Sequence, residues 1–248
     1  MSSGPPPESS SGRTDPHLLS VAEFIAERNG TAMAVGMVVG MAGGVAVGKS
    51  TTAAALSTLL AERFGIPTAV VSSDGFLMPN EVLADRSLLH RKGFPESYDG
   101  DAISVFLAAA RRGDSPLSVP IYDHLRYDVL PERLILDPTP VVVFEGVNAL
   151  HFSTELDTSI YIDAEESSMR RWYLDRVLGL RHRSVSDPSA FFAAFASLSD
   201  AEFAARAESI WEAVNLPNLI ECIGPTSATA DIVITKALDH SIRSVIFR

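Results

Sequence analysis

Apolar and polar residues follow two patterns along the chain. Short, almost wholly apolar runs predict buried strands, which we place at 34–41, 68–71, 141–144, 159–162 and 231–235. Stretches with apolar residues every three or four positions predict helices, at 49–64, 102–112, 164–180, 188–196 and 199–214. Because strands alternate with helices, we expect a doubly wound α/β fold, with a mostly parallel sheet covered on both faces and a helical excursion after Ile162.

The first residues depart from this alternation. Residues 1–16 are rich in Ser, Pro and Gly, which predicts a disordered tail, and residues 17–248 then form one domain. Residues 31–48 are uncharged, but they contain five glycines and run directly into Lys49. A buried strand followed by a glycine loop explains this run better than a membrane span, so we expect a soluble protein without a membrane partner.

Composition narrows the class of partner. The formal net charge is −11, which argues against nucleic acid as a primary ligand. The single cysteine, Cys222, excludes an internal disulfide and fits a reducing, cytoplasmic location. The basic residues are almost all arginine, and the three lysines are Lys49, Lys92 and Lys236, so the place of each lysine is informative.

The strongest local signal is a glycine-rich loop between a predicted strand and a predicted helix. Its sequence, GGVAVGKS, matches G-x-x-x-x-G-K-[ST]. In this pattern backbone N–H groups surround phosphate oxygens, the lysine reaches the β- and γ-phosphates and the hydroxyl ligates Mg²⁺. The sequence therefore predicts that a nucleoside triphosphate binds at Gly43, Gly44, Val45, Ala46, Val47, Gly48, Lys49, Ser50 and Thr51.

Two carboxylates follow predicted strands that end at the same edge of the sheet. Asp74 comes after the second strand and Glu145 after the strand at 141–144, and each precedes a glycine. In open α/β sheets ligands bind at the carboxyl ends of the strands. Such carboxylates suit two tasks, accepting the proton of an attacking hydroxyl and organising Mg²⁺.

Longer motifs resemble one family. The runs are 43–52, SDGFL at 73–77, RKGFPESYD at 91–99, PIYDHL at 120–125, EGVN at 145–148, RWY at 171–173, NLPNL at 215–219 and IGPT at 223–226. Together they resemble bacterial type I pantothenate kinase, within the larger group that contains uridine kinase and phosphoribulokinase. The resemblance covers roughly residues 30–248.

This resemblance implies a P-loop kinase that uses ATP and Mg²⁺ to phosphorylate the primary hydroxyl of pantothenate, the first step towards coenzyme A. It implies that Asp74 is the base on the substrate hydroxyl and that Ser50 and Glu145 bind the metal. It also implies that Arg176 closes over the transferring phosphate from a lid at about 164–214. The residues that would contact pantothenate are Tyr122, His124, Tyr173 and Asn215. His240 would lie near the adenine. Homodimerisation and feedback inhibition by coenzyme A follow from the resemblance alone.

Some positions depart from the family pattern. Val177, Leu180 and Val185 stand where aromatic residues are common, and Asp123 stands where serine is common. Two alternatives therefore stay open. The chain could phosphorylate another small alcohol, such as a nucleoside, a sugar or a glycerate-like compound, or it could be a nucleotide sensor without transfer activity.

Overall fold

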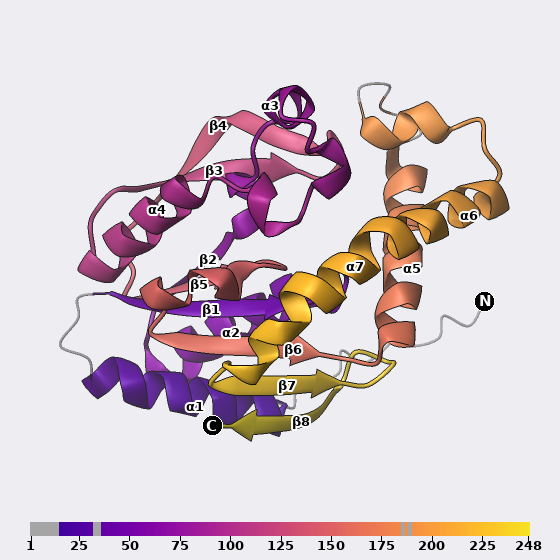
Figure 1. The fold of residues 1–248 in the computed structure, drawn as a ribbon. Helices are drawn as coiled ribbons and strands as arrows, with labels where there is room; N and C mark the ends of the chain where they lie inside the picture. The colour runs from indigo at the N-terminus through magenta and orange to yellow at the C-terminus, as the bar shows by residue number, and fades with distance from the viewer. Residues whose placement is uncertain (1–14, 32–35, 185–186, 188–189) are drawn as a thin grey trace, which may run out of the picture.

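The computed structural model describes residues 15–31, 36–184, 187 and 190–248 (Figure 1). The predicted tail lies outside the described residues except for Asp15 and Pro16. At these two residues a helix begins, because the Asp15 side chain accepts hydrogen bonds from the backbone N–H groups of His17 and Leu18.

A six-stranded sheet forms the centre of the molecule, in the order β2-β5-β1-β6-β7-β8. The first five strands in this order are parallel and β8 is antiparallel to β7, which confirms the predicted fold class. All five predicted strands are present. The sheet consists of β1 (Met37–Gly43), β2 (Thr68–Ser72), β5 (Val141–Glu145), β6 (Thr158–Asp163), β7 (Ile232–Lys236) and β8 (Ile242–Phe247).

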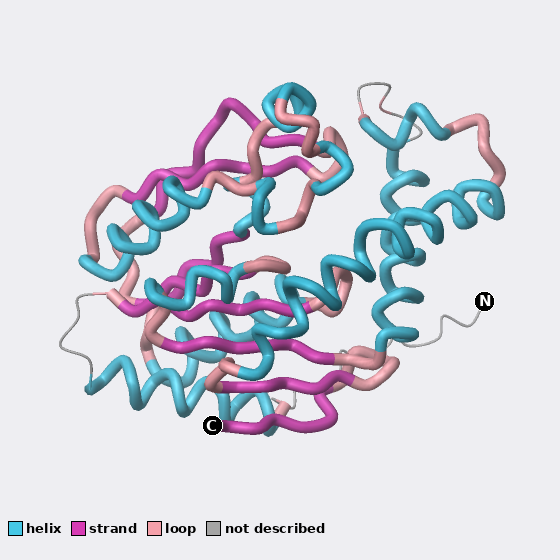
Figure 2. Tube along the Cα trace, in the orientation of Figure 1, coloured by secondary structure: helices cyan, strands magenta, loops and turns pink. Residues whose placement is uncertain are grey.

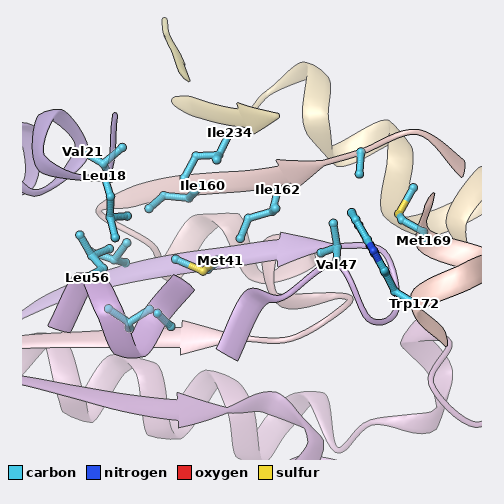
Figure 3. Close-up of a cluster of buried hydrophobic side chains, with 14 of the residues drawn as sticks. Leu18, Val21, Met41, Val47, Leu56, Ile160, Ile162, Met169, Trp172 and Ile234 are labelled. Carbon is cyan, nitrogen blue, oxygen red and sulfur yellow. The ribbon is translucent and has the colours of Figure 1, made fainter. Parts of the chain in front are cut away.

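Side chains that alternate along each strand divide the interior into two cores. Val39, Met41 and Ile160 face α1 (Pro16–Thr31) and α2 (Lys49–Phe64), in the cluster that also holds α5 (Glu166–Ser184) and α6 (Asp200–Ile210), partly drawn in Figure 3. Val38, Val142 and Phe144 face α4 (Gly100–Arg112) on the other side. Both faces of the sheet are therefore covered, as the sequence predicts.

A separate antiparallel hairpin lies above the sheet in Figure 1, and the sequence analysis missed it. It consists of β3 (Leu117–Asp123) and β4 (Asp128–Leu136), with α3 (Asn80–Asp85) nearby. Pro120 interrupts the first strand and β4 is largely exposed, so neither strand has a continuous apolar run. The helix α1 and the edge strand β8 were also not predicted.

The C-terminal helical run differs from the predicted regular helices (Figure 2). The helix expected at 188–196 is a 3₁₀ turn at Phe191–Phe195, within the residues described. The one expected at 199–214 is α6 followed by a π-helical turn, Trp211–Asn215, and then by the short α7 (Leu216–Asn218). Pro217 gives the reason, since it lacks the N–H that would bond to the carbonyl four residues earlier and its ring crowds that carbonyl.

In the part of the chain that the structure describes, no helix combines the length and apolar character needed to cross a bilayer.

Candidate active site

The glycine-rich loop connects β1 to α2, as the sequence predicts. Gly48, with φ 89°, turns the backbone into the first turn of α2. The Lys49 ammonium lies inside the loop and donates hydrogen bonds to the carbonyl oxygens of Gly43 (3.1 Å) and Gly44 (2.9 Å). Val47 supplies only backbone to the loop, because its side chain is fully buried in the core beside the sheet (Figure 3).

Ser50 and the two predicted carboxylates meet at the same end of the sheet. The Ser50 hydroxyl donates a hydrogen bond of 2.8 Å to Oε1 of Glu145. Glu145 is the last residue of β5 and pairs with Ser72, the last residue of β2. Asp74 follows in a 3₁₀ turn, where the Ser72 hydroxyl accepts a hydrogen bond from its backbone N–H. The spacing of the strands thus places Asp74, Glu145 and the loop together.

Burial governs the charges in this group. It lowers the pKa of Lys49, while Glu145 and then Asp74 act in the opposite direction. Burial also raises the pKa of Glu145, and the nearby Lys49 ammonium opposes that rise. Lys49 and Glu145 are both buried, so their charges and that of Asp74 interact strongly, and an added cation or a phosphate would change the balance.

The unpredicted hairpin forms one wall of the site. Gly75 makes this possible, because a side chain there would lie 2.2 Å from the carbonyl oxygen of Pro120 in β3. The close approach places Tyr122 and His124, whose rings are 5.1 Å apart, on the side of the site that holds Asp74. Asp123 is engaged in its own turn, where it accepts hydrogen bonds from the backbone N–H groups of Leu125 and Arg126.

Helix α5 forms the opposite wall. Nη2 of Arg176 lies 3.4 Å from Nε2 of His124. Burial lowers the pKa of His124 and the Arg176 charge lowers it further, whereas Asp74 raises it. A neutral imidazole can accept a hydrogen bond from the guanidinium, so the contact joins the hairpin to α5.

Tyr173 and Asn215, both predicted substrate contacts, lie close to each other. Burial raises the pKa of Tyr173 to about 12, and the neighbouring Asn215 side chain acts against this rise. Asn215 ends the π-helical turn, and its amide nitrogen is buried without a hydrogen-bond partner among the described residues. A buried amide donor that faces no acceptor fits a site that a polar substrate would complete.

The RKGFPESYD segment is held by residues to which the sequence analysis gave no role. The amide groups of Asn148 and Asn218 donate hydrogen bonds of 2.6 and 2.8 Å to one acceptor, the carbonyl oxygen of Gly93. The neighbouring Lys92 donates to the Asn80 amide oxygen and to the Tyr127 carbonyl, and burial lowers its pKa to about 8. Both asparagines lie in motifs that resemble the family, EGVN and NLPNL, and this was the one sign in the sequence that they have a role.

The predicted adenine contact, His240, lies in the turn between β7 and β8, beside α5. Its ring stacks on Trp172 with centroids 3.9 Å apart, and it lines an open cavity of about 700 Å³ with Arg171, Asp175 and Arg243. None of the other predicted site residues, all of which lie in the described part of the chain, lines this cavity.

Other positions singled out in the sequence differ in their burial. Thr51 is exposed on the first turn of α2. Val177 and Leu180 are buried in the core, and Val185 lies outside the described residues. Among the residues that the structure describes, no group of three or more His, Cys, Asp or Glu side chains could hold a metal.

Residues 38–188, which include the loop, both carboxylates and the hairpin, match the Phosphoribulokinase / Uridine kinase family. The chain belongs to that family. Within it, this kinase is 42% identical over 217 residues to a pantothenate kinase of Parvibaculum lavamentivorans, covering 82% of this chain and 67% of the relative. It is 45% identical over 213 residues to a pantothenate kinase of Sorangium cellulosum, with 82% and 69% covered.

Solved structures agree on the fold of this kinase. A D-glycerate 3-kinase from Cryptococcus neoformans superposes with a TM-score of 0.65 at 15% identity, covering 93% of this chain and 99% of that one. A phosphoribulokinase from Rhodobacter spheroides gives 0.51 at 11% identity, with 81% and 70% covered. At these identities the likeness concerns the fold alone.

Proposed function

We propose that this kinase transfers the γ-phosphoryl group of ATP to the primary hydroxyl of pantothenate, giving 4′-phosphopantothenate for coenzyme A biosynthesis. The observation that carries the proposal is the contact of His124 with Arg176 beside Asp74 and the glycine-rich loop, in a chain 42–45% identical to pantothenate kinases. A sensor would need the loop but not this acceptor side, so the arrangement favours transfer over binding alone.

Asp74 is the proposed base. Its carboxylate accepts the proton of the acceptor hydroxyl as the hydroxyl oxygen forms a bond to the γ-phosphorus. The bond between that phosphorus and the bridging oxygen breaks, and ADP leaves with the electron pair. Lys49 and Arg176 stabilise the charge on the phosphoryl oxygens, and both face this part of the site.

Ser50 and Glu145 are the proposed residues for Mg²⁺. Their oxygens lie 2.8 Å apart, and Glu145 is 5% exposed. Mg²⁺ prefers oxygen ligands and is held in kinases by one or two protein groups together with phosphates and waters, so this pair fits the ion. When bound, it would neutralise phosphate charge.

The acceptor is proposed to bind between the hairpin and α5. Tyr122 and His124 offer polar groups from one wall, and Tyr173 and Asn215 offer them from the other. The adenine is proposed to bind in the cavity beside His240. A homodimer, inhibition by coenzyme A and a cytoplasmic location remain predictions from the resemblance and composition.

The acceptor is tested by ADP release from purified protein and Mg·ATP, with pantothenate beside uridine, ribulose 5-phosphate and glycerate. We expect saturable, acceptor-dependent release with pantothenate and a product heavier by one phosphoryl group. Turnover with another of these alcohols alone would replace pantothenate as the substrate. ATP binding without turnover on any of them would leave a nucleotide sensor as the better account.

A further inference from the structure

Asn80, the first residue of α3, uses its backbone N–H and both ends of its side-chain amide to hold the tip of the hairpin, residues 123–128. The side-chain nitrogen donates a hydrogen bond of 2.9 Å to the carbonyl oxygen of Tyr127, and the backbone N–H donates one of 3.0 Å to Oδ1 of Asp128. The amide oxygen accepts one of 2.6 Å from the Lys92 ammonium, which also donates to the Tyr127 carbonyl at 2.6 Å. Asn80 therefore holds two consecutive hairpin residues and the cation beside them.

The backbone of Tyr127 needs these bonds. Its φ is 58°, in the left-handed region that residues with a bulky side chain rarely adopt. Such a conformation persists only where surrounding contacts hold it. Here the contacts are the two hydrogen bonds to the Tyr127 carbonyl oxygen and the stacking of its ring on Phe191, with centroids 4.6 Å apart. Loss of the Asn80 amide would thus leave this backbone less firmly held.

Asn80 also belongs to the short segment that carries Asp74. Backbone hydrogen bonds of 2.8 and 2.9 Å join Phe76 and Met78 of this segment to residues 97–99 of the RKGFPESYD motif. Asp74 lies just before these bonds and Asn80 just after them. The tip of the hairpin is therefore attached to the same fixed stretch of backbone as the proposed base.

The tip determines where the acceptor side lies. Tyr122 is near the end of β3 and His124 begins the turn that follows, and the rings of Tyr122 and Tyr127 make an edge contact with centroids 6.3 Å apart. The close approach of Gly75 to Pro120 holds the middle of β3 against the segment, and Asn80 holds the tip. A shift of the tip would therefore move the acceptor-side groups relative to Asp74, and catalysis is sensitive to displacements of about 1 Å.

We propose that Asn80 is a positioning residue for the acceptor. Through the carbonyl of Tyr127 it fixes the hairpin tip relative to Asp74, so that Tyr122 and His124 stay in place to bind the acceptor alcohol. Asn80 acts through these residues and does not itself contact the acceptor. The inference rests on the proposed function, because it uses the acceptor side that is assigned there.

The test compares Asn80→Ala and Asn80→Asp with the wild type. The first change removes both side-chain hydrogen bonds. The second keeps an acceptor for the Lys92 ammonium and removes the donor to the Tyr127 carbonyl. Steady-state rates give kcat and KM for the alcohol that the wild type phosphorylates, titration gives the Kd of Mg·ATP, and thermal unfolding gives the Tm. Hydrogen exchange of the amides in the hairpin tip and at Phe191 reports on the tip without any turnover.

Thr139→Val is the matched control. It also removes hydrogen bonds from a side chain to backbone carbonyls, those of Pro67 and Val141, at the end of β5 opposite to Glu145. We expect it to lower the Tm and to leave the kinetic constants and the exchange of the tip unchanged.

We expect both Asn80 variants to raise the acceptor KM at least about fivefold, with kcat changed less than about threefold and the Mg·ATP Kd within about twofold of the wild type. The phosphate loop and Asp74 stay in place, so the loss falls on acceptor binding. Exchange of the tip should become faster in both variants. Asn80→Asp should have a higher Tm than Asn80→Ala, because its carboxylate faces the Lys92 ammonium, and should keep the KM defect. A merely structural role would not separate KM from stability in this way.

An unchanged acceptor KM in Asn80→Ala would overturn the inference. So would a rise in KM that Asn80→Asp reverses, since the bond to the Tyr127 carbonyl would then have no part in it, or a rise that Thr139→Val shares. A wild-type protein that turns over none of the tested alcohols would instead refute the proposed function. Exchange would then decide the inference alone, and a tip that exchanges equally slowly in Asn80→Ala and the wild type would overturn it.

Discussion

Glu145 and Ser50 illustrate what single residues reveal from their spacing. The glycine-rich pattern places Ser50 at the start of a helix, and a carboxylate that ends a neighbouring parallel strand must lie at the same edge. The observed 2.8 Å hydrogen bond between them follows from these two facts. Spacing gave no comparable indication for Asn148 and Asn218, because their shared acceptor, Gly93, is distant in sequence from both.

The protonation of the buried Glu145 carboxylate makes the stability of the fold depend on pH. Because its folded-state pKa is raised, its contribution to stability is fully present below the ordinary value of 4.5 and is lost as the pH rises through the folded pKa. At neutral pH the buried charge therefore weakens the unliganded fold. We expect Glu145→Gln to have a higher Tm than the wild type at pH 7, with the difference shrinking as the pH falls towards 4.5.

Calorimetric scans from pH 4.5 to 8 measure this difference. Glu202→Gln is the opposite control, because the backbone hydrogen bond at Ser199 lowers the pKa of Glu202, whose carboxylate stabilises the fold as the pH rises. A Glu145→Gln variant that is less stable than the wild type by a constant amount at every pH would contradict the assigned cause.

At the scale of elements, prediction succeeded where one physical constraint dominates. The helix at 49–64 was predicted with its observed bounds, since glycines flank it and its buried face follows the helical period. The hairpin was not predicted, because its strands are only partly buried and Pro120 interrupts the apolar pattern of β3. The π-helical turn was not predicted, because residue periodicity does not distinguish it from an α-helix interrupted at Pro217. Helix α1 carried a usable signal, with Leu18, Val21, Ala22 and Ile25 at helical spacing.

Two asparagine side chains hold the segment around Gly93 in place. Asn148 on the loop after β5 and Asn218 at the end of α7 both donate to its carbonyl oxygen. Removing one donor leaves the carbonyl with one partner, whereas removing both leaves it unsatisfied. We expect Asn148→Ala and Asn218→Ala each to lower the free energy of unfolding by about 1 kcal/mol, and the double variant by more than the sum, with an added penalty of about 1–3 kcal/mol.

Urea unfolding of the four proteins measures this coupling. Ser57→Ala, which removes a side-chain hydrogen bond to the carbonyl of Thr68 away from the site, provides the additive control with either asparagine variant. Losses in the double variant that equal the sum of the single losses would show that the two amides do not act on one carbonyl.

At the scale of the whole molecule, three parts surround the site: the sheet, the hairpin and the helical region at about 164–214 that the sequence predicts to be a lid. The backbone N–H of Phe191 donates a 2.7 Å hydrogen bond to the carbonyl of Leu125, and the Phe191 ring stacks on Tyr127 with centroids 4.6 Å apart. The hairpin and the lid are therefore joined beside the site as well as through Arg176 and His124. Sequence patterns could not predict these contacts, because they join residues that are far apart in the chain and that follow no helical or strand periodicity.

A ligand that binds this assembled site should stabilise the whole fold. At an ATP concentration about 100-fold above its Kd the stabilisation is about 2.7 kcal/mol, which for a chain of this size raises the Tm by about 5–10 °C. We expect this shift for the wild type with Mg·ATP and its near loss in Lys49→Ala, measured by differential scanning calorimetry. A single transition in the same scans would also fit the predicted single domain. An equal shift in both proteins would place ATP elsewhere.

We propose that Asp74 activates the hydroxyl of pantothenate for attack on ATP bound at the glycine-rich loop. The most direct test is the steady-state rate with Mg·ATP and pantothenate for the wild type and Asp74→Asn, with the ATP Kd of each protein measured beside it. We expect saturable turnover by the wild type and a fall in kcat of about 10²–10⁴-fold in the variant, the range for loss of a general base, at an unchanged ATP Kd. A variant that turns over pantothenate at the wild-type rate would show that Asp74 is not the base.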